Sequence, residues 1–292
     1  MSLSIKQIHP LFVGEVSGVD LTKPLAAEEA AALEAAMDQY AVLVFHDQHL
    51  TDEQQQAFSR NFGELENARG GNVTKQEDRR LQTGMNDVSN LGKDNKPLAR
   101  DSRQRLFNLG NRLWHSDSSF RAIPAKYSLL SARAIPDGGG NTEFADMRAA
   151  YDDLDETTKS QIEELICEHS LMYSRGSLGF DVTDEEKLTF KPVRQRLTRT
   201  HPGSGRKALY LSSHIGTIIG WLVPEARMLI KDLTEHATQQ KYVYSHAWKQ
   251  YDLVMWDNRC TMHRARAFDE SQVRDMRRTT VGGSEMTVEQ AA

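Results

Sequence analysis

Apolar and polar residues follow distinct periods along the first part of the chain. They alternate through residues 12–16, which predicts early strands, and residues 26–40 form an alanine-rich stretch typical of a helix. Residues 41–45 are apolar without interruption, as expected for a strand buried on both faces. Thr51 opens a capping box, so we expect a second helix over residues 52–62.

The segment from residue 64 to residue 111 is polar, contains several glycines and shows little periodicity beyond one possible strand at 87–89. Long irregular segments inside a compact domain usually act as lids or are disordered. Because this segment ends just before the candidate metal ligands discussed below, we interpret it as an active-site lid.

Beyond residue 126, short strand-like runs alternate with turns. Helical stretches are expected at 156–168 and 224–238, and late strands at 242–244 and 253–256. Strands spread over the chain with helices between them favour a β-sandwich or barrel core over a regular βαβ series. Neither an internal repeat nor a linker is evident, so we expect one domain over residues 1–292.

Composition and charge narrow the class of protein. The formal net charge of −5 argues against a general nucleic-acid binder, because neutralising phosphates needs a basic surface. No apolar run approaches the roughly 18 residues of a membrane span, so we expect a cytoplasmic protein without membrane or nucleic-acid partners. Cys167 and Cys260 are too few for a disulfide scaffold and are expected to be buried small side chains.

A candidate metal site lies in the run Leu-Trp-His-Ser-Asp-Ser at residues 113–118. On an extended backbone, His115 and Asp117 would point to the same face. One imidazole and one carboxylate, completed by a distant histidine, form the facial triad of non-haem iron oxygenases, which leaves coordination positions open. Taken alone, this pair fits an internal hydrogen bond as well as it fits a metal site.

The third ligand would come from the last third of the chain, where the candidates are His201, His214, His236, His246 and His263. We favour His263, because it follows an apolar strand and a turn and so lies at a strand end, a usual place for site residues. His236 falls on a predicted helix, and His246 is expected to pack on a strand.

Taken together, the motifs resemble the taurine dioxygenase/TfdA family over nearly the whole length, and within it most of all the aryloxyalkanoate dioxygenases. The resemblance rests on residues 9–12 (HPLF), 42–45 (VLVF), 113–120 (LWHSDSSF), 142–144 (TEF), 146–152 (DMRAAYD), 200–207 (THPGSGRK), 253–260 (LVMWDNRC) and 263–264 (HR). It implies a double-stranded β-helix (jelly-roll) core with inserted and flanking α-helices. It also implies iron(II), dioxygen and 2-oxoglutarate, with succinate and carbon dioxide as products and ascorbate as a stimulant.

The same resemblance assigns roles to individual residues. His115, Asp117 and His263 match the iron ligands. Thr142 and Arg274 match the residues that bind the distal carboxylate of 2-oxoglutarate, for which a planar bidentate donor is well suited.

Substrate contacts are assigned in the same way. Arg278 matches the arginine that binds the anionic group of the substrate, and Asn111, His201 and His214 match positions near substrate or cofactor. Relatives often carry a second histidine three residues after His214, where this chain has Thr217. Without the resemblance, the arginines near 274–278 would be interpreted as a solvated basic strand.

These features predict hydroxylation of an aryloxyalkanoate, such as 2,4-dichlorophenoxyacetate, at the carbon next to the ether oxygen, giving a phenol and a 2-oxo acid such as glyoxylate. Alternatives are the same chemistry on taurine or another small sulfonate or carboxylate, and a jelly-roll metal-binding sensor without turnover. A zinc hydrolase fits less well, since it has no use for a keto-acid clamp. We also expect a homo-oligomer whose small-molecule partner is the aryloxy acid.

Overall fold

The computed structural model describes residues 3–67 and 79–290, and its main element is a seven-stranded sheet. All neighbours in this sheet are antiparallel except the parallel pair β2–β3. The strands in spatial order are β1 (Ser4–Gln7), β2 (Gly14–Ser17), β3 (Val42–Phe45), β13 (Leu253–Asp257), β5 (Ala125–Ala134), β15 (Asp275–Gly282) and β4 (Asn86–Asp87).

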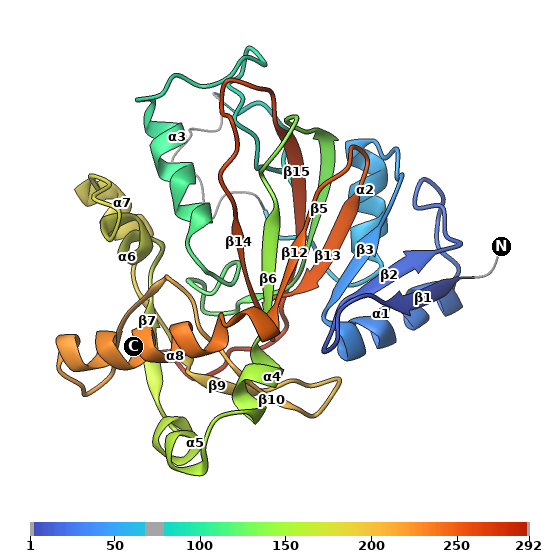
Figure 1. Cartoon of the computed structure of the whole chain (residues 1–292). Helices are drawn as coiled ribbons and strands as arrows, with labels where there is room; N and C mark the ends of the chain where they lie inside the picture. Colours follow the sequence, from blue (N-terminus) through green and yellow to red (C-terminus); the bar gives the residue numbers. More distant parts are fainter. Residues whose placement is uncertain (1–2, 68–78, 291–292) are drawn as a thin grey trace.

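A smaller antiparallel sheet lies beside the main one (Figure 1) and consists of β12 (Val243–His246), β6 (Thr142–Asp146) and β14 (Thr261–Ala265). Side chains of both sheets, including Phe144 from β6 and Trp256 from β13, form one buried cluster. The double-stranded β-helix with added helices, expected from the family resemblance, is confirmed.

The main sheet is buried on both faces, which explains the uninterrupted apolar run at residues 41–45. Val42 and Val44 belong to the cluster between the sheets. Leu43 and Phe45 point to the opposite face, where α1 (Ala27–Tyr40) and α2 (Asp52–Arg60) cover the sheet. Since successive strand side chains point to opposite faces, an apolar residue is needed at every position.

A second region packs helices against two smaller sheets around a third apolar cluster (Figure 1). Its strands are β7 (Ile166–His169), β8 (Val193–Arg196), β9 (Thr198–Thr200), β10 (Lys207–Leu209) and β11 (Ile215–Ile218). Its helices are α4 (Met147–Asp152), α5 (Glu156–Ile162), α8 (Val223–Ala237) and the short η4 (Gln240–Tyr242). Two further helices, α6 (Leu171–Gly176) and α7 (Asp184–Thr189), lie outside this cluster, and Leu171 and Met172 of α6 belong to a small separate one.

Most of the predicted elements lie near their expected positions, with two exceptions outside the active site. The helices predicted at 26–40, 52–62 and 224–238 are confirmed, and the buried cysteines are free. The helix predicted at 156–168 is wrong in its second half, because α5 ends at Ile162 and residues 166–169 form β7 with alternating burial.

The second exception concerns the secondary structure of the predicted lid, whose role as a lid stays a prediction. Part of it, residues 68–78, lies outside the described residues. The described remainder is more regular than expected, since it contains α3 (Arg103–Asn108) and the 3-10 helix η3 (Leu109–Arg112) besides the short strand β4. The hydroxyl of Ser102 caps α3 by accepting from the Arg105 N–H. None of the described helices is long and apolar enough to cross a membrane.

A fully buried ion pair joins β6 to α4 and generates a stability prediction. Asp146 caps α4 and accepts from Arg148 Nε at 3.0 Å, and neither side chain is exposed. We expect Arg148→Met to lower the free energy of unfolding by about 3–5 kcal/mol, because it leaves the Asp146 carboxylate buried without a cation. Urea denaturation followed by circular dichroism measures the loss.

The matched control is Arg206→Met. Arg206 pairs with Asp152, but both of these side chains are well exposed, so we expect a loss of at most about 1 kcal/mol. Equal losses for the two variants would contradict the importance assigned to the buried pair.

Candidate active site

Two remote segments are joined by backbone hydrogen bonds at the centre of the molecule. The N–H of His115 donates to the carbonyl of His263 at 3.0 Å, and the N–H of His263 donates back at 2.8 Å. His263 was predicted at a strand end, but it lies within β14, opposite Phe144 of β6. This backbone pairing brings the imidazole rings of His115 and His263 close together.

Asp117 reaches the same point by a route that the sequence pattern did not predict. His115 and Asp117 do not share one extended strand, because His115 forms only an isolated bridge and a turn with Ser118 at φ 55° follows. Asn258, in the loop after β13, holds this turn: its Oδ1 accepts from the Asp117 N–H at 3.1 Å, and its carbonyl accepts from Ser116 Oγ at 2.6 Å.

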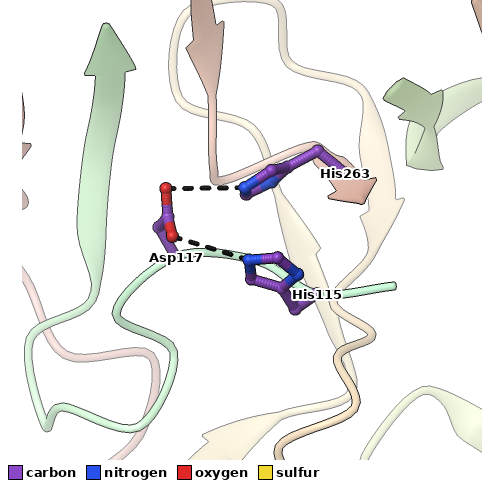
Figure 2. A group of neighbouring side chains, drawn as sticks. All are labelled: His115, Asp117 and His263. Atoms are coloured by element: carbon purple, nitrogen blue, oxygen red, sulfur yellow. Dashed lines mark ion pairs between the residues drawn. The ribbon is translucent and has the colours of Figure 1, made fainter. Parts of the chain in front are cut away.

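The three side chains converge in the way expected of ligands to one ion (Figure 2). Asp117 Oδ1 lies 3.8 Å from His115 Nε2, and Asp117 Oδ2 lies 3.6 Å from His263 Nε2. These separations are too long for hydrogen bonds. All three ligand atoms lie within 4.8 Å of one another, and the three residues are buried. Because His115 Nδ1 lies 2.7 Å from the Leu113 carbonyl, its Nε2 is left free to face the carboxylate.

The electrostatics of the group match a metal site. Burial lowers the pKa of both His115 and His263, which keeps the imidazoles neutral and their lone pairs available. Burial alone would raise the pKa of Asp117, but the charge of Arg278 and the neighbouring groups lower it to about 2. Arg278 Nη1 and Ser128 Oγ each donate to this carboxylate at 2.7 Å. The result is one anionic and two neutral ligands.

A cavity next to the triad is lined by His115, His263, Thr142 and Arg274. Arg274 is buried, and among the described residues its guanidinium donates only to two backbone carbonyls, those of Val88 at 3.1 Å and Gly140 at 3.4 Å. Burial lowers its pKa to about 10, and no acid among the described residues pairs with it. An uncompensated buried cation is costly, so this cavity is suited to an anionic ligand.

Thr142 and the glycines before it shape the same cavity. Gly140 has φ +70°, and a Cβ there would lie 3.3 Å from Arg274 Nε, so a side chain would crowd the guanidinium. Thr142 Oγ1 accepts from Trp248 Nε1 at 3.0 Å. That bond fixes the hydroxyl oxygen and leaves its proton free to donate to a ligand.

A larger cavity of about 720 Å³, open to solvent, adjoins the metal-type ligands on another side. Its walls include His115 and Asp117 together with the three predicted substrate contacts Asn111, His214 and Arg278. The sequence reasoning missed Arg175 and Glu66, which also line it, because neither lies in a motif with recognisable spacing.

Two other positions do not reach these cavities. His201 was predicted as a substrate contact, but it is fully buried and bonds Asp257 at 2.9 Å in a second group of metal-type ligands that also includes Cys260. Arg259 neutralises Asp257 at 2.6 Å, so this group is a closed internal network. Thr217 lies in β11, where its hydroxyl donates to the carbonyl of Ile218.

Comparisons with known proteins agree with this geometry. The model of the taurine catabolism dioxygenase TauD, TfdA family matches residues 4–280. The α-ketoglutarate-dependent 2,4-dichlorophenoxyacetate dioxygenase of Burkholderia sp. strain RASC is 47% identical over 97% of this chain and 95% of its own. The (S)-phenoxypropionate/α-ketoglutarate dioxygenase of Sphingobium herbicidovorans is 39% identical over 86% of this chain and 85% of its own.

Among solved structures, that of AAD-2 in complex with Mn(II) and N-oxalylglycine superposes with a TM-score of 0.97 at 68% identity, covering 99% of this chain and 100% of that one. The structural likeness therefore extends over the whole described fold and not only over the motifs. The protein belongs to the taurine catabolism dioxygenase TauD, TfdA family.

Proposed function

We propose that the protein is an iron(II)- and 2-oxoglutarate-dependent dioxygenase that hydroxylates an aryloxyalkanoate, such as 2,4-dichlorophenoxyacetate, next to its ether oxygen. The observation that carries this proposal is that a metal-type triad and a cavity suited to an anion lie side by side. A group of two histidines and one carboxylate lies beside a cavity that holds the uncompensated cation of Arg274. A metal store or sensor has no need for the second feature.

His115, Asp117 and His263 would hold the iron, because their donor set is that of the facial triad. When bound, iron and 2-oxoglutarate supply an oxidant for a C–H bond, with dioxygen consumed and succinate and carbon dioxide released. The names of the relatives support the use of 2-oxoglutarate, and a solved relative holds Mn(II) with N-oxalylglycine, a dicarboxylate of similar length. Ascorbate is expected to stimulate turnover by keeping the iron reduced.

The chain's own residues would bind and orient the two organic acids. Arg274 and Thr142 would take the distal carboxylate of 2-oxoglutarate, with Trp248 fixing the threonine. Arg278 would contact the carboxylate of the substrate with the N–H groups that Asp117 does not use. Asn111 and His214 would form part of the wall against which the aryloxy group packs.

The overall reaction balances without any further oxidant. Aryloxyacetate, 2-oxoglutarate and dioxygen give a hemiacetal, succinate and carbon dioxide. In the hemiacetal, the bond between the hydroxylated carbon and the aryl ether oxygen then breaks, and the hydroxyl proton moves to that oxygen. The products are a phenol and glyoxylate. The prediction of a cytoplasmic homo-oligomer stays a prediction, which native mass measurement and localisation would test.

The substrate class is tested by products. With iron(II), 2-oxoglutarate and ascorbate, we expect 2,4-dichlorophenoxyacetate to yield 2,4-dichlorophenol and succinate in equal amounts, measured by chromatography. Taurine in the same assay should release little sulfite. Sulfite in place of phenol would move the proposal to alkylsulfonates, and succinate from neither compound would reject both.

The metal ligands are tested by substitution. We expect His263→Ala or Asp117→Ala to lose bound iron and to abolish turnover, because two remaining ligands hold a divalent ion poorly. Iron content and succinate formation are measured together, with circular dichroism as the check on folding. His236→Ala is the control, since this histidine lies on α8 and bonds only the Ala150 carbonyl. A His263→Ala protein that retained iron and activity would show the assignment to be wrong.

The two arginines near the end of the chain have separable duties. Arg274→Ala should raise the Michaelis constant for 2-oxoglutarate roughly 30- to 5000-fold, since losing one partner of a buried ionic contact costs about 2–5 kcal/mol. Arg278→Ala should mainly raise the constant for the aryloxy acid. Both are measured at saturating iron, because Arg278 also bonds the ligand Asp117. Equal effects of the two variants on 2-oxoglutarate would refute the division.

A further inference from the structure

Arg175, near the end of α6, projects into the large cavity beside the predicted substrate contacts Asn111 and His214. Arg175 as a whole residue is only 5% exposed. Its Nη1 donates to Ser174 Oγ at 3.0 Å, its Nη2 donates to Asn111 Oδ1 at 3.5 Å, and its Nε has no partner in the part of the chain that the structure describes. All of these partners are neutral, so the guanidinium retains an uncompensated charge.

The surroundings hold this guanidinium in one place. It lies over the ring of Phe107 with 4.5 Å between its central carbon and the ring centroid. On another side it packs against Gly110, where an added Cβ would come within 2.1 Å of Nη1. Ser174 Oγ also lies 3.0 Å from His214 Nδ1, which ties the arginine to the cavity wall. A cation fixed on several sides is ready to bind an anion without reorganising.

Comparison with the other buried arginines shows how unusual this arrangement is. Among the described residues, the buried arginines are Arg148, Arg175 and Arg274. Arg148 is neutralised by Asp146, whereas Arg175 and Arg274 form no ion pair with any described residue. Burial lowers the pKa of each of these two to about 10. The fold therefore keeps two buried cations without acids, one in each cavity beside the triad.

The proposed reaction uses two organic anions, and Arg274 suits 2-oxoglutarate. We propose that Arg175 binds the carboxylate of the aryloxyalkanoate and so selects anionic substrates, an inference that rests on the proposed function. Arg278 already donates to Asp117 and would make a supplementary contact to the same carboxylate. Removing Arg175 should thus affect the charge preference of the large cavity and leave the 2-oxoglutarate cavity intact.

The test measures binding to the protein loaded with iron(II) and 2-oxoglutarate without oxygen. Calorimetric titrations compare 2,4-dichlorophenoxyacetate with its uncharged primary amide. For Arg175→Met we expect the affinity for the acid to fall roughly 30- to 5000-fold, while that for the amide changes less than about threefold. Arg175→Lys should recover part of the preference for the acid. The affinity for 2-oxoglutarate should stay as in the unmodified protein.

Arg103→Met is the matched control. Arg103 also lies over an aromatic ring, that of Phe180, but it pairs with Glu186, is half exposed and lies outside the cavity lining. It should leave both affinities unchanged.

Each other outcome overturns a distinct claim. Equal losses for acid and amide, or a loss of 2-oxoglutarate binding, would reduce Arg175 to a packing residue, and an unchanged affinity for the acid would remove it from the substrate site. If the unmodified protein failed to bind the acid, the proposed substrate class would fall, and this inference with it.

Discussion

The cost of burying charge is the constraint on which the site depends. The charged carboxylate of Asp117 is stable in the interior because Arg278 and Ser128 donate hydrogen bonds to its oxygens. The imidazoles of His115 and His263 stay neutral beside it. Among the residues that the structure describes, no acid compensates the charge of Arg274 or of Arg175. Each of the two cavities therefore contains a buried positive charge, which the proposed anionic ligands would neutralise.

The scaffold holds the ligands through a few backbone and amide contacts. The reciprocal hydrogen bonds between His115 and His263 connect segments about half the chain apart. Asn258 acts as the second connector. It accepts from the Asp117 N–H and from Trp256 Nε1, and its Nδ2 donates to Ser128 Oγ, which itself donates to the Asp117 carboxylate. The carboxylate is therefore positioned from both its backbone and its side chain.

The sequence predicts the elements with strong periodicity and the residues within motifs. The alanine-rich helix α1 and the buried strand β3 follow from apolar spacing alone, and the capping box at Thr51 correctly starts α2. The three residues of the triad were assigned mainly by family resemblance, because a His-x-Asp pair is too common in sequences to identify a metal site. An extended backbone would place His115 and Asp117 on one face, whereas a contact from Asn258 holds a turn at Asp117.

What the sequence could not provide are the contacts that depend on long-range packing. Arg175 lies in no recognisable motif, and only the fold encloses it between Phe107 and Gly110. His201 was expected to contact substrate, whereas in the structure its ring bonds Asp257. Helix α3 was missed because its segment is polar and short. Such residues carry no local signal, since their environment is created by segments distant in sequence.

The central claim is that oxidation of the aryloxy acid and decarboxylation of 2-oxoglutarate occur together in this one site. The most direct measurement is a single-turnover reaction under ¹⁸O₂ with 2,4-dichlorophenoxyacetate, analysed by mass spectrometry. The account predicts one labelled oxygen in each succinate, one succinate for each phenol, and no label in the phenol, whose oxygen is that of the original ether. Label in the phenol, or phenol released without labelled succinate, would contradict it.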